Sequence, residues 1–135
     1  MPEQQQPAEL SLPVRSSKPR RSGITSMIDF GPDTFGWSGG ERGISDLLDV
    51  AANYIDYAKI YAMNALLIPA DVVKRTTRLY LDADVMPFAG GILFEYAWHR
   101  NEIDGLITML KRLAIPGLEI SENYVTLSDE ERARM

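Results

Sequence analysis

The fold is decided by residues 57–94, which read YAKIYAMNALLIPADVVKRTTRLYLDADVMPFAGGILF. This stretch predicts a strand over Tyr57–Met63, a helix that begins near Pro69, and a further strand within Met86–Phe94 that breaks at Gly90-Gly91. Proline suits the first turn of a helix, because an N–H there has no partner within the helix. The buried stripe of this helix has helical spacing and consists of Val72, Val73, Thr76, Leu79 and Tyr80. Strand, helix and strand in succession are typical of a right-handed βαβ unit with parallel strands.

The same alternation continues on both sides of this stretch. Upstream, a strand over Ile24–Phe30 and a glycine-rich loop precede a helix whose apolar stripe is Ile44, Leu47, Leu48, Ala51 and Ile55. Downstream, Pro116-Gly117 ends a helix and Leu118–Ser121 forms a fourth strand. The stripe of that last helix is Ile103, Leu106, Ile107, Leu110 and Leu113. The sequence therefore predicts an α/β fold built from parallel βαβ units.

The number of units indicates how much of a larger architecture is present. A (β/α)8 TIM barrel needs about 250 residues, whereas this chain has 135 and supplies three units plus one strand. Ser128-Asp129-Glu130-Glu131 has the form of a capping box, the signature of a helix start, and the sequence ends at Met135. We therefore expect residues 23–135 to form the front half of a barrel, as a truncated unit. A complete four-stranded open sheet is the alternative, but it leaves the capping box unexplained.

Composition limits where the protein is expected to be located and which partners it is expected to bind. Residues 1–22 are rich in Gln, Pro, Ser and Arg and predict a disordered arm, whose basic cluster Arg15–Arg21 we interpret as solvated. The chain has 14 Lys and Arg against 19 Asp and Glu, which argues against a nucleic-acid partner. It has no cysteine and no apolar run near the roughly 20 residues of a membrane span. We expect a cytoplasmic protein.

Polar side chains alternate with apolar ones along three of the predicted strands. Asp29, Lys59, Glu119 and Ser121 all lie on the face opposite the apolar set, if each strand alternates regularly. We expect this face to point into the barrel near the carboxyl ends of the strands, where parallel α/β proteins place their sites. A lysine flanked by two carboxylates suits an anion or enolate site. An internal ion-pair network without chemistry is the alternative.

Glycines give two further candidates for binding. Gly90 and Gly91 permit close approach of a backbone or a ligand, or form a simple strand bend. The loop 36–43 offers backbone N–H groups that suit a phosphate, although its spacing fits neither a Walker loop nor a dinucleotide fingerprint. The alternative for this loop is a flexible connection.

Acidic residues just past the strand ends suggest a metal site. Glu95 and Glu122, with Asp29 and Glu119, supply the oxygen ligands that Mg²⁺ prefers. His99 is the single histidine, and we expect it to be an ordinary residue at the surface or rim.

Four segments resemble the phosphosulfolactate synthase family: residues 27–31, 49–59, 90–97 and 118–121. The resemblance runs from about Gly23 to the C-terminus and implies a (β/α)8 barrel with a Mg²⁺ cofactor. It also implies a carbon–sulfur lyase that adds sulfite to phosphoenolpyruvate, an early step towards coenzyme M. The expected partner is a small enol phosphate or related anion. The expected catalytic residues are Lys59, Asp29 and Glu119. The expected substrate-binding residues are Gly90, Gly91 and Ser121, and the expected metal ligands are Glu95 and Glu122.

Some positions depart from the family pattern. Phe30 replaces a lysine, Ile92 replaces a threonine, and Glu122 replaces an aspartate. These differences favour a second hypothesis, in which the chain is a non-catalytic, stress-related or partner-binding member, as the family's plant heat-stress-associated relatives suggest. A third hypothesis is a truncated product without activity of its own. For any half-barrel, the unpaired edges of the first and fourth strands predict self-association, either as a homodimer or as aggregates.

Overall fold

A computed structural model describes residues 10–11, 13–31 and 40–135. Four strands form one sheet: β1 (Ser26–Asp29), β2 (Tyr57–Ile60), β3 (Met86–Ala89) and β4 (Gly117–Leu118). The helices are α1 (Gly40–Ala51), the 3-10 turn η2 (Ala52–Tyr54), α2 (Asn64–Leu67), α3 (Ala70–Asp82), α4 (Gly91–His99), α5 (Ile103–Arg112) and α6 (Asp129–Ala133).

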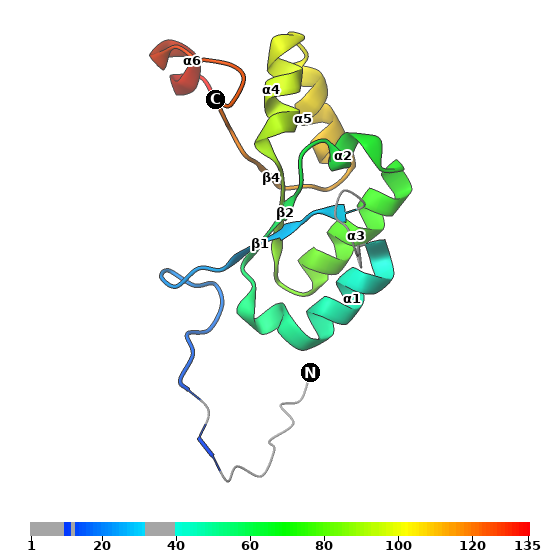
Figure 1. The fold of residues 1–135 in the computed structure, drawn as a ribbon, viewed down its shortest axis with the longest axis vertical. Helices are drawn as coiled ribbons and strands as arrows, with labels where there is room; N and C mark the ends of the chain where they lie inside the picture. Colours follow the sequence, from blue (N-terminus) through cyan, green and yellow to red (C-terminus); the bar gives the residue numbers. More distant parts are fainter. Residues whose placement is uncertain (1–9, 12, 32–39) are drawn as a thin grey trace.

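The sheet confirms the predicted fold class. Its order is β1-β2-β3-β4, and every neighbouring pair is parallel. Helices separate the strands along the chain, so the architecture is α/β and consistent with the front half of a (β/α)8 barrel (Figure 1). The predicted capping box is also present at Ser128 and Glu131, where it starts α6.

The third strand is shorter than predicted. It ends at Ala89, and a helix rather than a strand begins at Gly91. Leu93, Phe94 and Ala97 of this helix are buried in the larger hydrophobic cluster. The second strand likewise ends at Ile60, and the single turn of α2 follows it.

Two hydrophobic clusters hold the helices against one face of the sheet. The smaller cluster joins Ile44 and Leu48 of α1 to Tyr80 of α3 and Ala58 of β2. The larger one joins β2 and β3 to α3, α4 and α5, and Leu127 packs into it from the C-terminal segment. Burial of this apolar surface is the main stabilising term of the fold.

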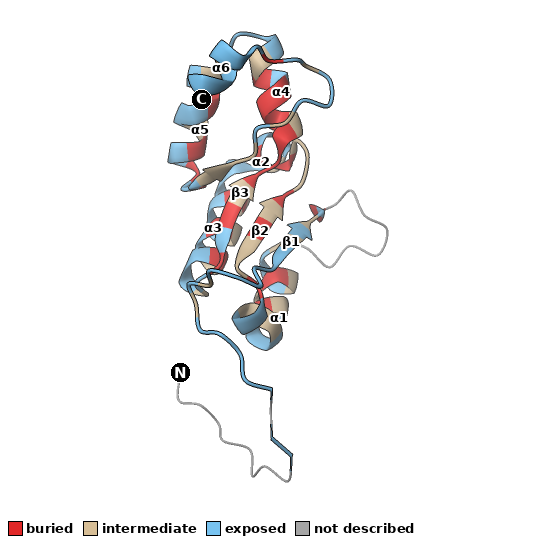
Figure 2. Cartoon of the chain, turned by 90° about the vertical axis from the view of Figure 1, so that its left-hand side faces the viewer, coloured by how far each residue is buried: buried red, intermediate tan, exposed pale blue. Residues whose placement is uncertain are grey.

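The opposite face of the sheet has no helix over it among the described elements, as Figure 2 shows. The strand register places Ile28, Lys59, Phe88 and Gly117 side by side on this face. Ile28 is 44% exposed and Met86, two residues before Phe88, is 47% exposed. We call this surface the open face; in a closed barrel it is the interior.

The N-terminal arm contacts the connections that precede β2 and β3 already before the predicted boundary at residue 22. Lys18 donates to the backbone oxygen of Asp84, and Arg20 pairs with Asp56 at 2.7 Å. Disorder of residues 1–22 stays a prediction, because residues 1–9 and 12 lie outside the described part of the chain. No described helix is long and apolar enough to cross a membrane, and a cytoplasmic location stays a prediction.

Candidate functional site

The open face carries an ion pair at the carboxyl ends of its strands. Lys59 of β2 lies with its Nζ 2.7 Å from Oε2 of Glu119, which follows β4. Their side chains are 25% and 36% exposed, so the pair is partly shielded from water. The structure thus brings together two of the three predicted catalytic residues, in the position where parallel α/β proteins bind their ligands.

Gly91, the first residue of α4, adds a backbone donor to this pair. Its N–H donates to the same Oε2 of Glu119 at 2.8 Å. Partial positive charge at a helix N-terminus favours an anion there. Burial raises the pKa of Glu119, but the hydrogen bonds from Lys59 and Gly91 outweigh it and hold the pKa below its ordinary value of 4.5. Glu119 is therefore an ionised carboxylate held by a cation and an N–H group.

Two glycines make this convergence sterically possible. A Cβ on Gly91 would overlap the side chain of Ser121 and lie 3.3 Å from Cγ of Glu119. A Cβ on Gly90 would lie 3.3 Å from Cε of Lys59 and 3.1 Å from the backbone oxygen of Ile60. Gly90 and Gly91 thus line the site and permit the close approach of neighbouring groups, which was one of the roles expected from the sequence. Their binding of substrate stays a prediction.

Asp29 lies on the other side of the sheet, so the predicted shared face is wrong for this residue. It is in register with Ile60, and its Oδ2 accepts a hydrogen bond from the hydroxyl of Tyr80 in α3 at 2.9 Å. Burial, and then the charge of Asp29, raise the pKa of the Tyr80 phenol. Regular alternation holds along β1, but its helix-facing set is Met27 and Asp29, while the apolar Ile28 faces outward.

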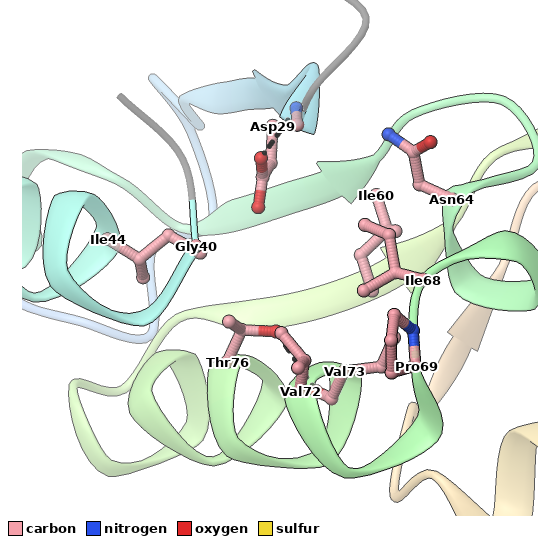
Figure 3. Close-up of a pocket in the computed structure, with 11 residues that line it drawn as sticks. Asp29, Gly40, Ile44, Ile60, Asn64, Ile68, Pro69, Val72, Val73 and Thr76 are labelled. Carbon is pink, nitrogen blue, oxygen red and sulfur yellow. Dashed lines mark hydrogen bonds between the residues drawn. The ribbon is translucent and has the colours of Figure 1, made fainter. Parts of the chain in front are cut away.

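The Asp29 side chain borders a cavity of about 290 Å³ between the sheet and α3. Figure 3 shows its carboxylate pointing into a space bordered mostly by apolar side chains, among them Ile60, Ile68 and Val73. Lys59 and Glu119 do not line this cavity. Catalysis by Asp29 stays a prediction.

Ser121 contacts Glu95 rather than an open substrate space. Its hydroxyl donates to Oε1 of Glu95, a residue of α4 that is only 3% exposed. The backbone N–H and side-chain amide of Asn123 donate to the same oxygen, and the N–H groups of Tyr124 and Val125 donate to Oε2. Burial raises the pKa of Glu95, but these hydrogen bonds lower it to about 2. Substrate binding by Ser121 stays a prediction.

Glu122 is engaged by the C-terminal segment. Oε1 accepts from Arg132 at 2.8 Å, and Oε2 accepts from the N–H of Leu127 and from Arg132 again. The bond from Arg132 is the main cause that lowers the pKa of Glu122 to about 2. This contact anchors α6 beside the segment that follows β4.

The two carboxylates predicted to bind Mg²⁺ do not fit the ion in this conformation. A carboxylate offers about four lone-pair sites, and Glu95 already accepts five hydrogen bonds whose donors would repel a cation. Glu122 is neutralised by Arg132. Among the residues that the structure describes, no cluster of three His, Cys, Asp or Glu side chains has a metal-binding arrangement. Mg²⁺ dependence stays a prediction.

The remaining candidates add nothing to the Lys59–Glu119 pair. The first half of the glycine-rich loop, residues 36–39, lies outside the described residues, and Gly40–Gly43 form the first turn of α1. His99 is exposed at the end of α4, as expected for a surface histidine. Sequence reasoning missed the backbone donors of residues 123–125, because no local pattern shows that they meet a side chain from α4.

Comparisons with known proteins show the family of the chain. The family model for (2R)-phospho-3-sulfolactate synthase (ComA) matches residues 13–135. The phosphosulfolactate synthase of Methanothermobacter thermautotrophicus is 32% identical over 123 residues, which cover 91% of this chain and 45% of that protein. The proteins of the same name from Methanocaldococcus jannaschii and Bacillus subtilis are 32% and 28% identical, over 82% and 92% of this chain and 41% and 46% of their own lengths. The chain spans less than half the length of these curated relatives. It belongs to the phosphosulfolactate synthase (ComA) family.

Proposed function

We propose that the open face of this chain carries the enol-phosphate site of a phosphosulfolactate synthase-like barrel. The reaction of that family adds sulfite to phosphoenolpyruvate. One observation carries the proposal: the ammonium group of Lys59 and the N–H of Gly91 converge on a single carboxylate oxygen. A cation beside a helix N-terminus is an arrangement that stabilises an anion.

In this proposal each residue has one task. Lys59 neutralises negative charge on the enol phosphate as it develops, and the Gly91 N–H donates to the same anion. Glu119, which holds that position in the free chain, gives it up to the ligand and serves as the nearby acid or base. Gly90 and Gly91 leave the space that the ligand needs. The enol phosphate, the sulfite and the lyase reaction are all part of the proposal, since the chain covers less than half of its named relatives.

Calorimetric titration with phosphoenolpyruvate tests the proposal without added metal. We expect saturable binding by the natural chain and its loss in Lys59→Met. Lys74→Met is the matched control, since Lys74 is exposed on α3, away from the open face. Absence of binding by the natural chain, or equal binding by Lys59→Met, contradicts the proposal.

A non-catalytic, stress-related or partner-binding role is the competing proposal. It is favoured by the engagement of Lys59 with Glu119, since such a pair also suits a structural ion-pair network. In that case Lys59→Met lowers stability, because the partly buried carboxylate of Glu119 loses its partner. Phosphoenolpyruvate then binds neither to the natural chain nor to Lys59→Met. The same titration, combined with urea unfolding of the natural chain and of Lys59→Met, separates the enol-phosphate site from the non-catalytic role.

Self-association is part of the proposed function, with a second copy of this chain as the partner. β1 and β4 each have a strand neighbour on one side only among the described strands, and the open face exposes Ile28 and Met86. Parallel sheets are normally covered on both faces. Two copies supply the eight strands of a closed barrel. Sedimentation velocity at micromolar concentration should show a dimer, whereas a single monomeric species with a sharp cooperative melt contradicts this partner.

A further inference from the structure

Glu95 is a buried carboxylate without a cation. It lies in α4 with 3% of its surface exposed, and no Lys, Arg or His in the described chain forms an ion pair with it. A buried charge is costly unless it is paired or fully hydrogen-bonded. Here the compensation comes from N–H and O–H donors alone, so the donors and the carboxylate depend on each other.

Those donors all come from one short segment, Ser121–Val125, which has no helix or strand of its own. Three consecutive backbone N–H groups, those of Asn123, Tyr124 and Val125, point at the two oxygens of Glu95. Successive N–H groups that converge in this way form a concave anion-binding nest. Because these groups have no strand partner, the carboxylate replaces the hydrogen bonds that a strand would provide.

This segment is continuous with the Lys59–Glu119 site. Ser121 follows Glu119 by two residues and packs so closely on Gly91 that a Cβ there would overlap it. Its hydroxyl is fixed by Glu95. A shift of Ser121 therefore moves Glu119 relative to Lys59 and the Gly91 N–H.

We propose that Glu95 is a positioning residue: its carboxylate fills a nest of backbone N–H groups and thereby holds Ser121 and Glu119 in place beside Lys59 and Gly91. The expected effect of Glu95 on ligand affinity rests on the proposed function, whereas the placement of Ser121 and Glu119 by Glu95 does not.

The experiment compares Glu95→Gln and Glu95→Ala with the natural chain by ¹⁵N–¹H correlation spectra and phosphoenolpyruvate titration. Glu95→Gln keeps the shape of the side chain, so it covers the case in which Glu95→Ala fails to fold. Glu102→Gln is the matched control, because Glu102 is an exposed carboxylate that pairs with Arg100. Excess formate is added to Glu95→Ala, with chloride at equal ionic strength as its control, to refill the nest with a small anion.

We expect both Glu95 variants to shift the amide signals of residues 123–125 and of Gly91. Their phosphoenolpyruvate affinity falls by about tenfold, as for one lost charge-assisted hydrogen bond. Formate, but not chloride, restores the signals and the affinity of Glu95→Ala. A purely structural role would lower stability and leave the affinity of the folded chain unchanged.

The outcomes separate this inference from the proposed function. If the natural chain does not bind phosphoenolpyruvate, the proposed function fails, and the amide signals alone decide the positioning role. If the signals of residues 123–125 and Gly91 are the same in Glu95→Gln and the natural chain, the inference is overturned even if phosphoenolpyruvate binds. Unchanged affinity in a Glu95→Gln chain with shifted signals also overturns it.

Discussion

Replacement of Gly91 by alanine should destabilise the chain by about 3 kcal/mol and disrupt the Lys59–Glu119 site. The added Cβ overlaps the Ser121 side chain and lies 3.3 Å from Cγ of Glu119. Overpacking of this kind costs about 1–3 kcal/mol. Displacement of Ser121 also breaks its charge-assisted bond to Glu95, a loss of about 1.5–3 kcal/mol. The better helix propensity of alanine offsets about 1 kcal/mol of this.

Urea unfolding followed by circular dichroism measures the effect, and Gly105→Ala is its control. Gly105 lies in α5, where an added Cβ meets nothing within 4 Å. Alanine there should stabilise the chain by about 0.5–1 kcal/mol, because it reduces the entropy lost on folding. The two glycine substitutions should therefore have opposite signs. If Gly91→Ala is as stable as the natural chain or gains stability as Gly105→Ala does, the close approach of Ser121 to Gly91 is wrong.

Three further predictions concern pH, the arm and turnover. The pKa values of Glu95 and Glu122 are about 2 in the folded chain, below their ordinary value of 4.5. The two ionised carboxylates therefore contribute fully to stability above about pH 4.5, and this contribution is lost as the pH falls towards 2. Urea unfolding midpoints that stay constant between about pH 5 and 2.5 contradict this prediction. Arg20→Met should lower the melting temperature, because it removes the cation from a pair whose side chains are only 9% and 8% exposed, whereas Arg78→Met, at an exposed pair, should change it much less; thermal melts of both variants measure the difference, and equal melting temperatures contradict it. Finally, the isolated chain with phosphoenolpyruvate, sulfite and Mg²⁺ should give no phosphosulfolactate by mass spectrometry, since it spans less than half of its relatives; robust turnover refutes this.

The alternation of strands and helices was predictable because each βαβ unit leaves a local signal. Helical spacing in α1, α3 and α5 and the capping box at Ser128 are visible within a few residues. The helix α4 was not predictable in the same way. Its apolar residues lie on nearly all sides, so Ile92–Phe94 fit a buried strand as well as a buried helix.

The site was predicted in part for a related reason. Alternation along a strand gives two faces but does not say which one the helices cover, and this placed Asp29 on the wrong side. Lys59 was placed correctly because its neighbours Ala58 and Ile60 are apolar and buried, and Glu119 because Leu118 before it packs against the larger hydrophobic cluster. The contacts of Glu95 join residues 26 to 30 positions apart, and no periodicity encodes a contact at that separation.

The central claim is that Lys59 and the Gly91 N–H form one anion-binding site on the open face. The most direct measurement is a phosphoenolpyruvate titration of the ¹⁵N-labelled chain in which the Gly91 amide signal is followed. We predict a saturable shift of this signal in the natural chain and in Lys74→Met, and its loss in Lys59→Met. A Gly91 signal that does not move, or one that moves equally in Lys59→Met, would contradict the claim.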